Sequence, residues 1–370
     1  MAIPNGICKS LNWGCMREAS KGRGGRGKHH CQRYLSRYLS LLLNLLIEFC
    51  IILGMSESGF TFEVLFDEEL IKFCTRNISC VGNENVVSMA NDYDEGFWRI
   101  DRFLDFIWDN IKDAALTANE RTALIGQEGS VIRRAASRLR LSAKDTDKSK
   151  GSEIAEILLY GIMRRYYGAL PVVPKIFTKQ NRSDTVKGAD SVHIVLTSDD
   201  GFELWLGEAK FYKTISDKDI ERFVGSINET LSRIALDKEK SLIVASPDLV
   251  PCIRMATNSE ATDLIERIRK VLMQETPLDE LRPLIHVPIL LLYECPLTAK
   301  TTEYSDVYKT KLIEDHRERA MSYFEEQIKE LKGKIHYYDR IHFHLILFPV
   351  ANKKSIVDKF EAVAKAHRGG

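Results

Sequence analysis

Glu208 and Lys210 are the two residues whose types and spacing best suit hydrolytic chemistry in this chain of 370 residues. They lie two positions apart in the run FELWLGEAKFY (202–212), so both side chains project from the same face of a β-strand. The other positions on both faces are mostly apolar, which predicts an interior strand of a sheet that is covered on both sides. Charged side chains are costly to bury there unless they are paired or bind a ligand. This pair is therefore a candidate functional site.

Asp190 is the candidate partner of Glu208 on the neighbouring strand. It lies in a run that predicts a strand over 186–198, and it is the only charged residue on its face of that run. The SDDG turn (198–201) folds the two strands together. A strict two-residue turn sets Glu208 opposite Ser191 and puts Asp190 on the other face, whereas a bulge or a three-residue turn sets the two carboxylates opposite each other. Both registers stay open.

The two carboxylates would form a binding site for a hard divalent cation, because oxygen ligands suit Mg²⁺ or Mn²⁺. The main-chain carbonyl of Ala209 is a candidate further ligand. The ammonium of Lys210 can hold or help to activate an attacking water, and it can stabilise charge that develops on a phosphoryl oxygen. The alternative is that Lys210 forms a buried ion pair with Glu208 or Asp190 that serves only the fold.

The Glu-x-Lys spacing is uninformative by itself. The chain holds a second copy, Glu330-Leu331-Lys332, in a charged helix where solvated side chains are expected. The copy at Glu208 differs in its setting, which combines an apolar interior strand, an acidic residue on the preceding strand and a particular order of elements. That order is helix, three strands, helix and strand, predicted at 151–168, 172–177, 186–198, 202–212, 217–235 and 241–246.

Later elements extend this unit, and a helical region precedes it. After residue 250 the patterns predict helices and strands that alternate, which indicates an α/β extension of the sheet; the helices are at 258–272, 307–333 and 354–367 and the strands at 286–294 and 340–350. Upstream, apolar residues spaced by three and four predict helices at 68–74, 97–111 and 128–141. We therefore expect a helical N-terminal domain over 55–148 and an α/β domain over 149–370.

Residues 1–54 differ in composition from the rest of the chain. They carry eight Lys or Arg against two Glu, a net charge of +6, which leaves the remainder near −5 although the whole chain is at +1. The Gly/Arg-rich stretch at 21–30 predicts disorder. The apolar run at 38–54 is short and contains an Asn and a Glu, which argues against a spanning helix. Our leading interpretation is a disordered or mis-annotated extension that ends before Met55; an amphipathic anchor and a targeting sequence are the alternatives.

Composition excludes several classes of protein. Eight cysteines are scattered and no C-x-x-C pair occurs, so the pattern disfavours both a zinc ribbon and a disulfide scaffold. A reducing cytoplasm fits this usage, and we expect no stable association with a membrane. Because the total charge is near zero, any nucleic-acid surface on the main body must be local.

The motifs KIFTK, G-A-D in KGADSVHIVL and G-E-A-K in LWLGEAKFY resemble those of the PD-(D/E)XK nuclease superfamily. More narrowly, they resemble the HamA family, the nuclease effectors of the bacterial Hachiman anti-phage system. The resemblance covers residues 150–350 well and residues 55–150 loosely, and residues 1–54 have no recognised counterpart. It implies a restriction-endonuclease-like core, metal binding by Asp190 and Glu208, Lys210 as the catalytic lysine and a HamB-like helicase as partner. Ala189 stands where the superfamily name has Pro, which is a common variation.

Proteins that resemble this superfamily often supply a further acidic residue from the first core helix. Glu153 and Glu156 are both available there, and Glu156, in the more apolar part of the helix, is our choice as a further metal ligand. The alternative for either is an acid that offsets the helix dipole. Several basic side chains either contact phosphate, DNA or a partner or are simply solvated: Lys175, Lys179, Lys213, Arg133, Arg134, Arg138 and Arg140. We expect structural roles for His193, His342 and His344.

We therefore expect a Mg²⁺- or Mn²⁺-dependent endonuclease that cleaves DNA in anti-phage defence under the control of a helicase. The partner interface is expected in the helical N-terminal region and the late α/β extension. The rival is a catalytically silent nuclease-fold module that binds DNA or docks the helicase. An intact Asp–Glu–Lys set argues against the rival, because a scaffold has no reason to keep three charges in an apolar sheet.

Overall fold

The computed structural model describes residues 63–65, 83–140, 151–178, 188–198 and 201–368. The chain divides into two compact units, Met1–Thr61 and Phe62–Gly370, and the described residues all belong to the second. The predictions for residues 1–54, for a helix at 68–74 and for the tip of the SDDG turn lie outside the described residues, as does Lys179. In the described part, no helix is long and apolar enough to cross a membrane.

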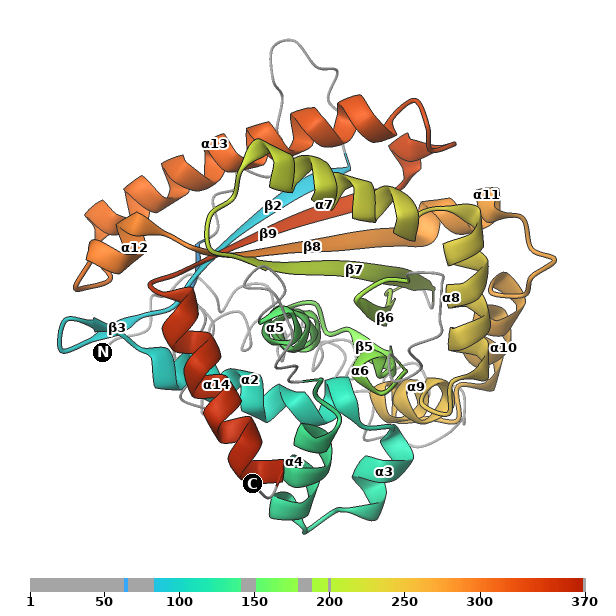
Figure 1. The fold of residues 1–370 in the computed structure, drawn as a ribbon. Helices are drawn as coiled ribbons and strands as arrows, with labels where there is room; N and C mark the ends of the chain where they lie inside the picture. Colours follow the sequence, from blue (N-terminus) through green and yellow to red (C-terminus); the bar gives the residue numbers. More distant parts are fainter. Residues whose placement is uncertain (1–62, 66–82, 141–150, 179–187, 199–200, 369–370) are drawn as a thin grey trace, which may run out of the picture. The chain divides into compact units, whose positions relative to one another are not determined.

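A mixed sheet, seven-stranded within the described residues, lies at the centre of this unit (Figure 1). The middle strands β2, β9, β8 and β7 run parallel to one another. Strands β6 and β5 continue the sheet antiparallel beyond β7, and β1 pairs antiparallel with β2 at the other edge. The strands are β1 Glu63–Leu65, β2 Glu84–Ala90, β5 Leu170–Val173, β6 Ser191–Leu196, β7 Phe202–Tyr212, β8 Ile285–Glu294 and β9 His342–Val350. A separate small hairpin is formed by β3 (Tyr93–Asp94) and β4 (Phe97–Trp98).

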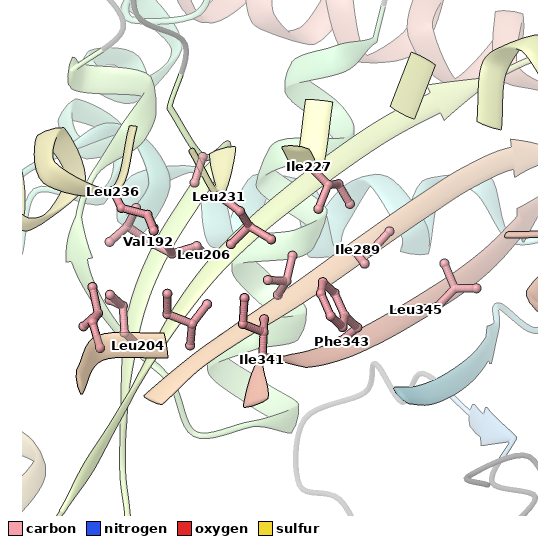
Figure 2. Packing of buried hydrophobic residues seen from close by; sticks show 14 of the residues in the cluster. Val192, Leu204, Leu206, Ile227, Leu231, Leu236, Ile289, Ile341, Phe343 and Leu345 are labelled. Atoms are coloured by element: carbon pink, nitrogen blue, oxygen red, sulfur yellow. The ribbon is translucent and has the colours of Figure 1, made fainter. Parts of the chain in front are cut away.

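Helices cover both faces of the sheet (Figure 1). On one face, Leu204 and Leu206 of β7 belong to the same buried cluster as Ile227 and Leu231, which come from α7 and from the residue after it (Figure 2). On the other face, α5 packs against β7 and is itself packed against α2. The helices around the sheet are α2 Ile100–Ala115, α5 Ser152–Tyr166, α7 Asp217–Thr230, α8 Arg233–Ala245, α13 Asp306–Leu331 and α14 Lys353–Arg368. Shorter helices are α3 Ala118–Ala123, α4 Glu128–Ser137, α6 Lys175–Thr178, α9 Leu249–Thr257, α10 Thr262–Val271, α11 Leu278–Leu281 and α12 Pro296–Lys300.

Several predicted elements are confirmed with small shifts of their ends. β7 covers the predicted run 202–212 without change, and α5 ends where Gly168, in the left-handed region at φ +60°, follows the helix. The strands predicted at 286–294 and 340–350 are β8 and β9, and the helices predicted at 307–333 and 354–367 are α13 and α14. These runs were long and strongly patterned, and burial on both faces explains the continuous apolar sequence of β8.

Two predicted strands are wrong in whole or in part. The run 172–177 is strand only up to Val173, and α6 begins at Lys175. The run 241–246 is not a strand but the C-terminal half of α8, whose buried positions recur at helical spacing: Ala235, Leu236, Glu239, Lys240 and Ile243. A short apolar run does not by itself distinguish a strand from a buried helix segment. The strand that follows β7 in the sheet is instead β8, parallel to it.

The region before residue 140 contributes to the same sheet. Helices α2 and α4 lie in two of the stretches predicted to be helical, although α2 begins only after Phe97 and Trp98 have formed β4. Strand β2 was not predicted, and it pairs in parallel with β9. The boundary predicted at residue 148 falls in 141–150, outside the described residues, so the three-part division stays a prediction.

Candidate functional site

Asp190 and Glu208 lie opposite each other at the point where β6 begins beside β7. The register pairs Ser191 with Gly207, and the amide of Asp190 donates to the carbonyl of Gly207 over 2.8 Å. At the other end of the hairpin, the amide of Thr197 donates to the carbonyl of Gly201 over 3.2 Å, so three residues separate the last paired positions. The register that puts the two carboxylates on one face is therefore the one present, and the strict two-residue turn is wrong.

Three oxygen atoms converge on the ammonium of Lys210. Its Nζ lies 3.0 Å from Oδ2 of Asp190, 3.1 Å from the carbonyl oxygen of Ala209 and 3.4 Å from Oε2 of Glu208. The side chain of Lys210 is 34% exposed, whereas those of Asp190 and Glu208 are 13% and 5% exposed. The lysine is thus the most exposed side chain of the group, and the two carboxylates beside it are more deeply buried.

Neighbouring groups hold both carboxylates in place. The hydroxyl of Thr230, the last residue of α7, donates to Oε1 of Glu208 over 2.6 Å, and Thr230 is itself buried. The amide of Ala209 donates to Oδ2 of Asp190 over 3.2 Å. Phe223, also on α7, places its ring 5.5 Å from the ammonium of Lys210, within cation–π range. The orientation of the group therefore depends on α7 as well as on the hairpin.

The electrostatics of the site favour a charged lysine. Burial acts to lower the pKa of Lys210, but the nearby carboxylates of Asp190, Glu208 and Glu156, together with the hydrogen bond to Asp190, outweigh it and raise the pKa above its ordinary value. Lys210 is therefore a permanent cation at neutral pH in this arrangement, and it donates hydrogen bonds to the oxygens around it.

The first core helix brings Glu156 near this group. Glu156 is buried on α5, and its charge contributes to the raised pKa of Lys210. Glu153 instead accepts the amide of Arg140 with both carboxylate oxygens, at 2.8 and 3.0 Å. Burial raises the pKa of Glu153 to about 7. The role of Glu156 as a further metal ligand stays a prediction.

The donor set is suited to a hard cation by chemical type. Within the described residues, no group of three or more His, Cys, Asp or Glu side chains is arranged to hold a metal ion. The set here consists of two carboxylates and one main-chain carbonyl, and all three oxygens already surround a positive charge. Oxygen ligands of this kind fit Mg²⁺ or Mn²⁺. An ammonium ion pair that serves only the fold would use the same contacts.

The other basic and histidine candidates lie away from this chemistry or are already paired. Lys175 is buried against Glu239 at 2.6 Å, so it is neither a solvated lysine nor a phosphate contact. Arg138 is tied to Glu120 at 2.7 Å, while Arg133 and Lys213 are exposed. The structural role expected for His193 agrees with its position, since it is fully buried beside Tyr160. His342 and His344 form part of a stack of rings with His286 and Trp205.

The second Glu-x-Lys copy differs from the first as expected. Glu330 is partly exposed on α13 and pairs with Lys334 at 2.7 Å, and Lys332 lies 3.6 Å from Asp339. Sequence reasoning missed Thr230 and Glu239, because their partners lie 22 and 64 positions away and no local pattern marks them.

Comparison with known proteins shows a match to one protein family. A model of the family described as HamA matches residues 68–364. The match covers α5, the hairpin and α7, and therefore every residue of the candidate site. None of the curated proteins matches the chain.

Proposed function

Because the chain belongs to the HamA family, we propose that it is a metal-dependent endonuclease that cleaves DNA in Hachiman anti-phage defence under the control of a helicase partner. Family membership suggests the defence role. The observation that carries the nuclease assignment is the convergence of oxygens from Asp190, Glu208 and Ala209 on the ammonium of Lys210. A carboxylate pair beside a lysine suits phosphodiester hydrolysis, where both a cation and an ammonium stabilise developing negative charge.

The order of elements supports a PD-(D/E)XK-like core. Helix α5 lies on one face of the sheet, the antiparallel strands β5, β6 and β7 follow, α7 covers the other face, and β8 adds a strand parallel to β7. The final strand of this core is thus β8 rather than the run at 241–246. The helices α8 to α11 are inserted between α7 and that strand.

Each residue of the group has a distinct role in the proposal. Asp190, Glu208 and the carbonyl of Ala209 would hold Mg²⁺ or Mn²⁺, with Glu156 as a further acidic residue. When bound, such a cation supplies a Lewis acid next to the scissile phosphate. The partly exposed ammonium of Lys210 holds the attacking water and donates to a phosphoryl oxygen. Thr230 keeps one oxygen of Glu208 occupied, so that the other oxygen faces the lysine.

The rival function is a silent nuclease-fold module that binds DNA or docks the helicase. One observation favours it: both Asp190 and Glu208 already pair with the ammonium of Lys210, so part of their negative charge is compensated without a metal ion. The two functions differ in whether the chain cleaves DNA at all.

A plasmid-cleavage assay separates the two. The full chain is purified, is incubated with supercoiled plasmid in Mg²⁺, Mn²⁺ or EDTA, and is assayed with and without a HamB-like helicase. We expect metal-dependent nicking that falls by about 100-fold or more in Lys210→Ala and Glu208→Ala. The matched control is Glu330→Ala with Lys332→Ala in the second Glu-x-Lys copy at the end of α13, which should cleave like the wild type. Cleavage that is unchanged in the site variants rejects the site, and DNA binding without cleavage under every condition favours the silent module.

A further inference from the structure

A second buried ion pair, Lys175 with Glu239, contacts the main chain at the residue before Asp190. The ammonium of Lys175, at the start of α6, contacts both carboxylate oxygens of Glu239 on α8, at 2.6 and 2.7 Å. The two side chains are 5% and 0% exposed. Desolvation offsets most of the attraction in such a pair, and apolar side chains of similar volume would be about as stable. The net stability of the fold therefore does not explain the pair.

The carboxylate of Glu239 also holds the chain next to Asp190. Its Oε1 accepts the amide of Ala189 over 3.1 Å. Gly188 leaves the space for this contact, because a Cβ at that position would lie 2.2 Å from the same Oε1. The two residues immediately before Asp190 thus both contact the same buried carboxylate, Ala189 through its amide and Gly188 through the space that its missing side chain leaves.

The main chain at Asp190 is therefore held from two sides. Glu239 on α8 accepts from the amide of Ala189, and the carbonyl of Gly207 on β7 accepts from the amide of Asp190 over 2.8 Å. Asp190 lies just before the first residue of β6, where the ladder of the hairpin ends. At the end of a ladder the backbone has fewer partners, so an anchor from outside the sheet has the most effect there.

We propose that Glu239, itself held by Lys175, is a positioning residue that fixes the backbone at Ala189 and thereby aims the carboxylate of Asp190 at the divalent cation. The proposal rests on the proposed function, since it assigns Asp190 to the cation. Residues that orient a metal ligand in this way set its affinity for the metal, and their loss costs about 10–100-fold in that affinity.

Two double variants of the full chain isolate the contact with Ala189. Lys175→Met with Glu239→Leu removes both charges and the acceptor, whereas Lys175→Met with Glu239→Gln removes the charges and keeps a carbonyl oxygen that can accept from Ala189. Thermal unfolding establishes that each variant is folded, and calorimetric titration with Mn²⁺ measures its affinity. We expect the leucine double variant to bind Mn²⁺ about 10–100-fold more weakly and the glutamine double variant to stay within about threefold of the wild type.

Gly188→Ala provides a second route that keeps both charges. The added Cβ displaces the carboxylate of Glu239 from Ala189, so we expect a loss of Mn²⁺ affinity in the same direction. Asp190→Asn is the reference for loss of the ligand itself. If the leucine double variant and Gly188→Ala both bind Mn²⁺ like the wild type while Asp190→Asn does not, the positioning role is overturned and the proposed function stands. If Asp190→Asn also binds like the wild type, the proposed function fails and the positioning role with it.

Discussion

The ammonium of Lys210 lies 3.0 Å from Oδ2 of Asp190, although the two residues are 20 positions apart in the sequence. The contact exists because the hairpin register puts Asp190 across from Glu208, and because Lys210 shares the face of Glu208 on β7. A charged side chain in the middle of a sheet is retained at a cost in desolvation. The grouping of opposite charges on one buried face is what ties the fold to the proposed chemistry.

Thr230 should control the metal affinity of Glu208. Thr230→Val keeps the shape of the side chain but removes the hydroxyl that donates to Oε1 of Glu208. We expect Thr230→Val to weaken Mn²⁺ binding by about 10–100-fold, and Thr230→Ser, which keeps the hydroxyl, to stay close to the wild type. Calorimetric titration with Mn²⁺ measures both. A valine variant that binds Mn²⁺ as tightly as the serine variant would show that Thr230 does not orient Glu208.

Gly207 should be intolerant of a side chain. A Cβ there would lie 2.2 Å from Oγ of Ser191 and 2.8 Å from Cδ2 of Leu159, so Gly207→Ala would push α5 away from the sheet. We expect a loss of about 1–3 kcal/mol in the free energy of unfolding, measured with urea. The matched control is Gly225→Ala on α7, where a Cβ meets nothing within 4 Å. Alanine favours the helix, so this control should gain about 0.5–1 kcal/mol. Equal effects at the two glycines would contradict the packing of α5 described above.

The sequence predicted the long elements well and the connections poorly. β7 was predicted to the residue because eleven consecutive positions carry one pattern between clear turn signals. The run at 241–246 was assigned to a strand because a short run with four apolar residues fits either state. Only the burial of Glu239 and Ala235, one and two turns before Ile243, indicates a helix. β2 was missed because its partner β9 lies more than 250 positions away, so that no local pattern shows the pairing.

The site itself was predictable in part for the same reason. Strand parity places Glu208 and Lys210 on one face without any knowledge of the fold. The position of Asp190 depends on the register, and the register depends on one residue in the turn. Thr230 and Glu239 reach the site only through the packing of α7 and α8, and such tertiary contacts leave no periodic trace in the sequence.

Glu84 should make stability fall as the pH rises. Burial on β2 raises the pKa of Glu84 to about 7, and the charge of Lys332 lowers this pKa by a smaller amount. The folded protein therefore holds this proton more tightly than the unfolded chain, so stability is lost between about pH 4.5 and pH 7. Relative to the wild type, Glu84→Gln should gain stability steadily across that range and stay level above it.

The difference between variant and wild type isolates Glu84 from other groups. Buried histidines, with pKa values lowered by burial, act in the opposite direction in the same range, but they are common to both proteins. Urea unfolding at pH 5, 6, 7 and 8 measures the difference. Glu330→Gln is the control. The hydrogen bond from Lys334 lowers the pKa of Glu330, so the difference between this variant and the wild type should be level over these pH values. A level difference for Glu84→Gln as well would contradict the raised pKa.

Calorimetric titration of the full chain with Mn²⁺ tests the central claim, that Asp190 and Glu208 bind a divalent cation on the face they share with Lys210. We expect binding to be lost in Asp190→Asn with Glu208→Gln. In Lys210→Met, where no ammonium competes for the same oxygens, we expect binding roughly tenfold tighter than in the wild type. If Lys210→Met binds Mn²⁺ more tightly but no longer cleaves DNA, the metal ligands and the catalytic lysine have distinct roles. Mn²⁺ affinity that is the same in all three proteins would contradict the account and leave the ion pair as a structural feature alone.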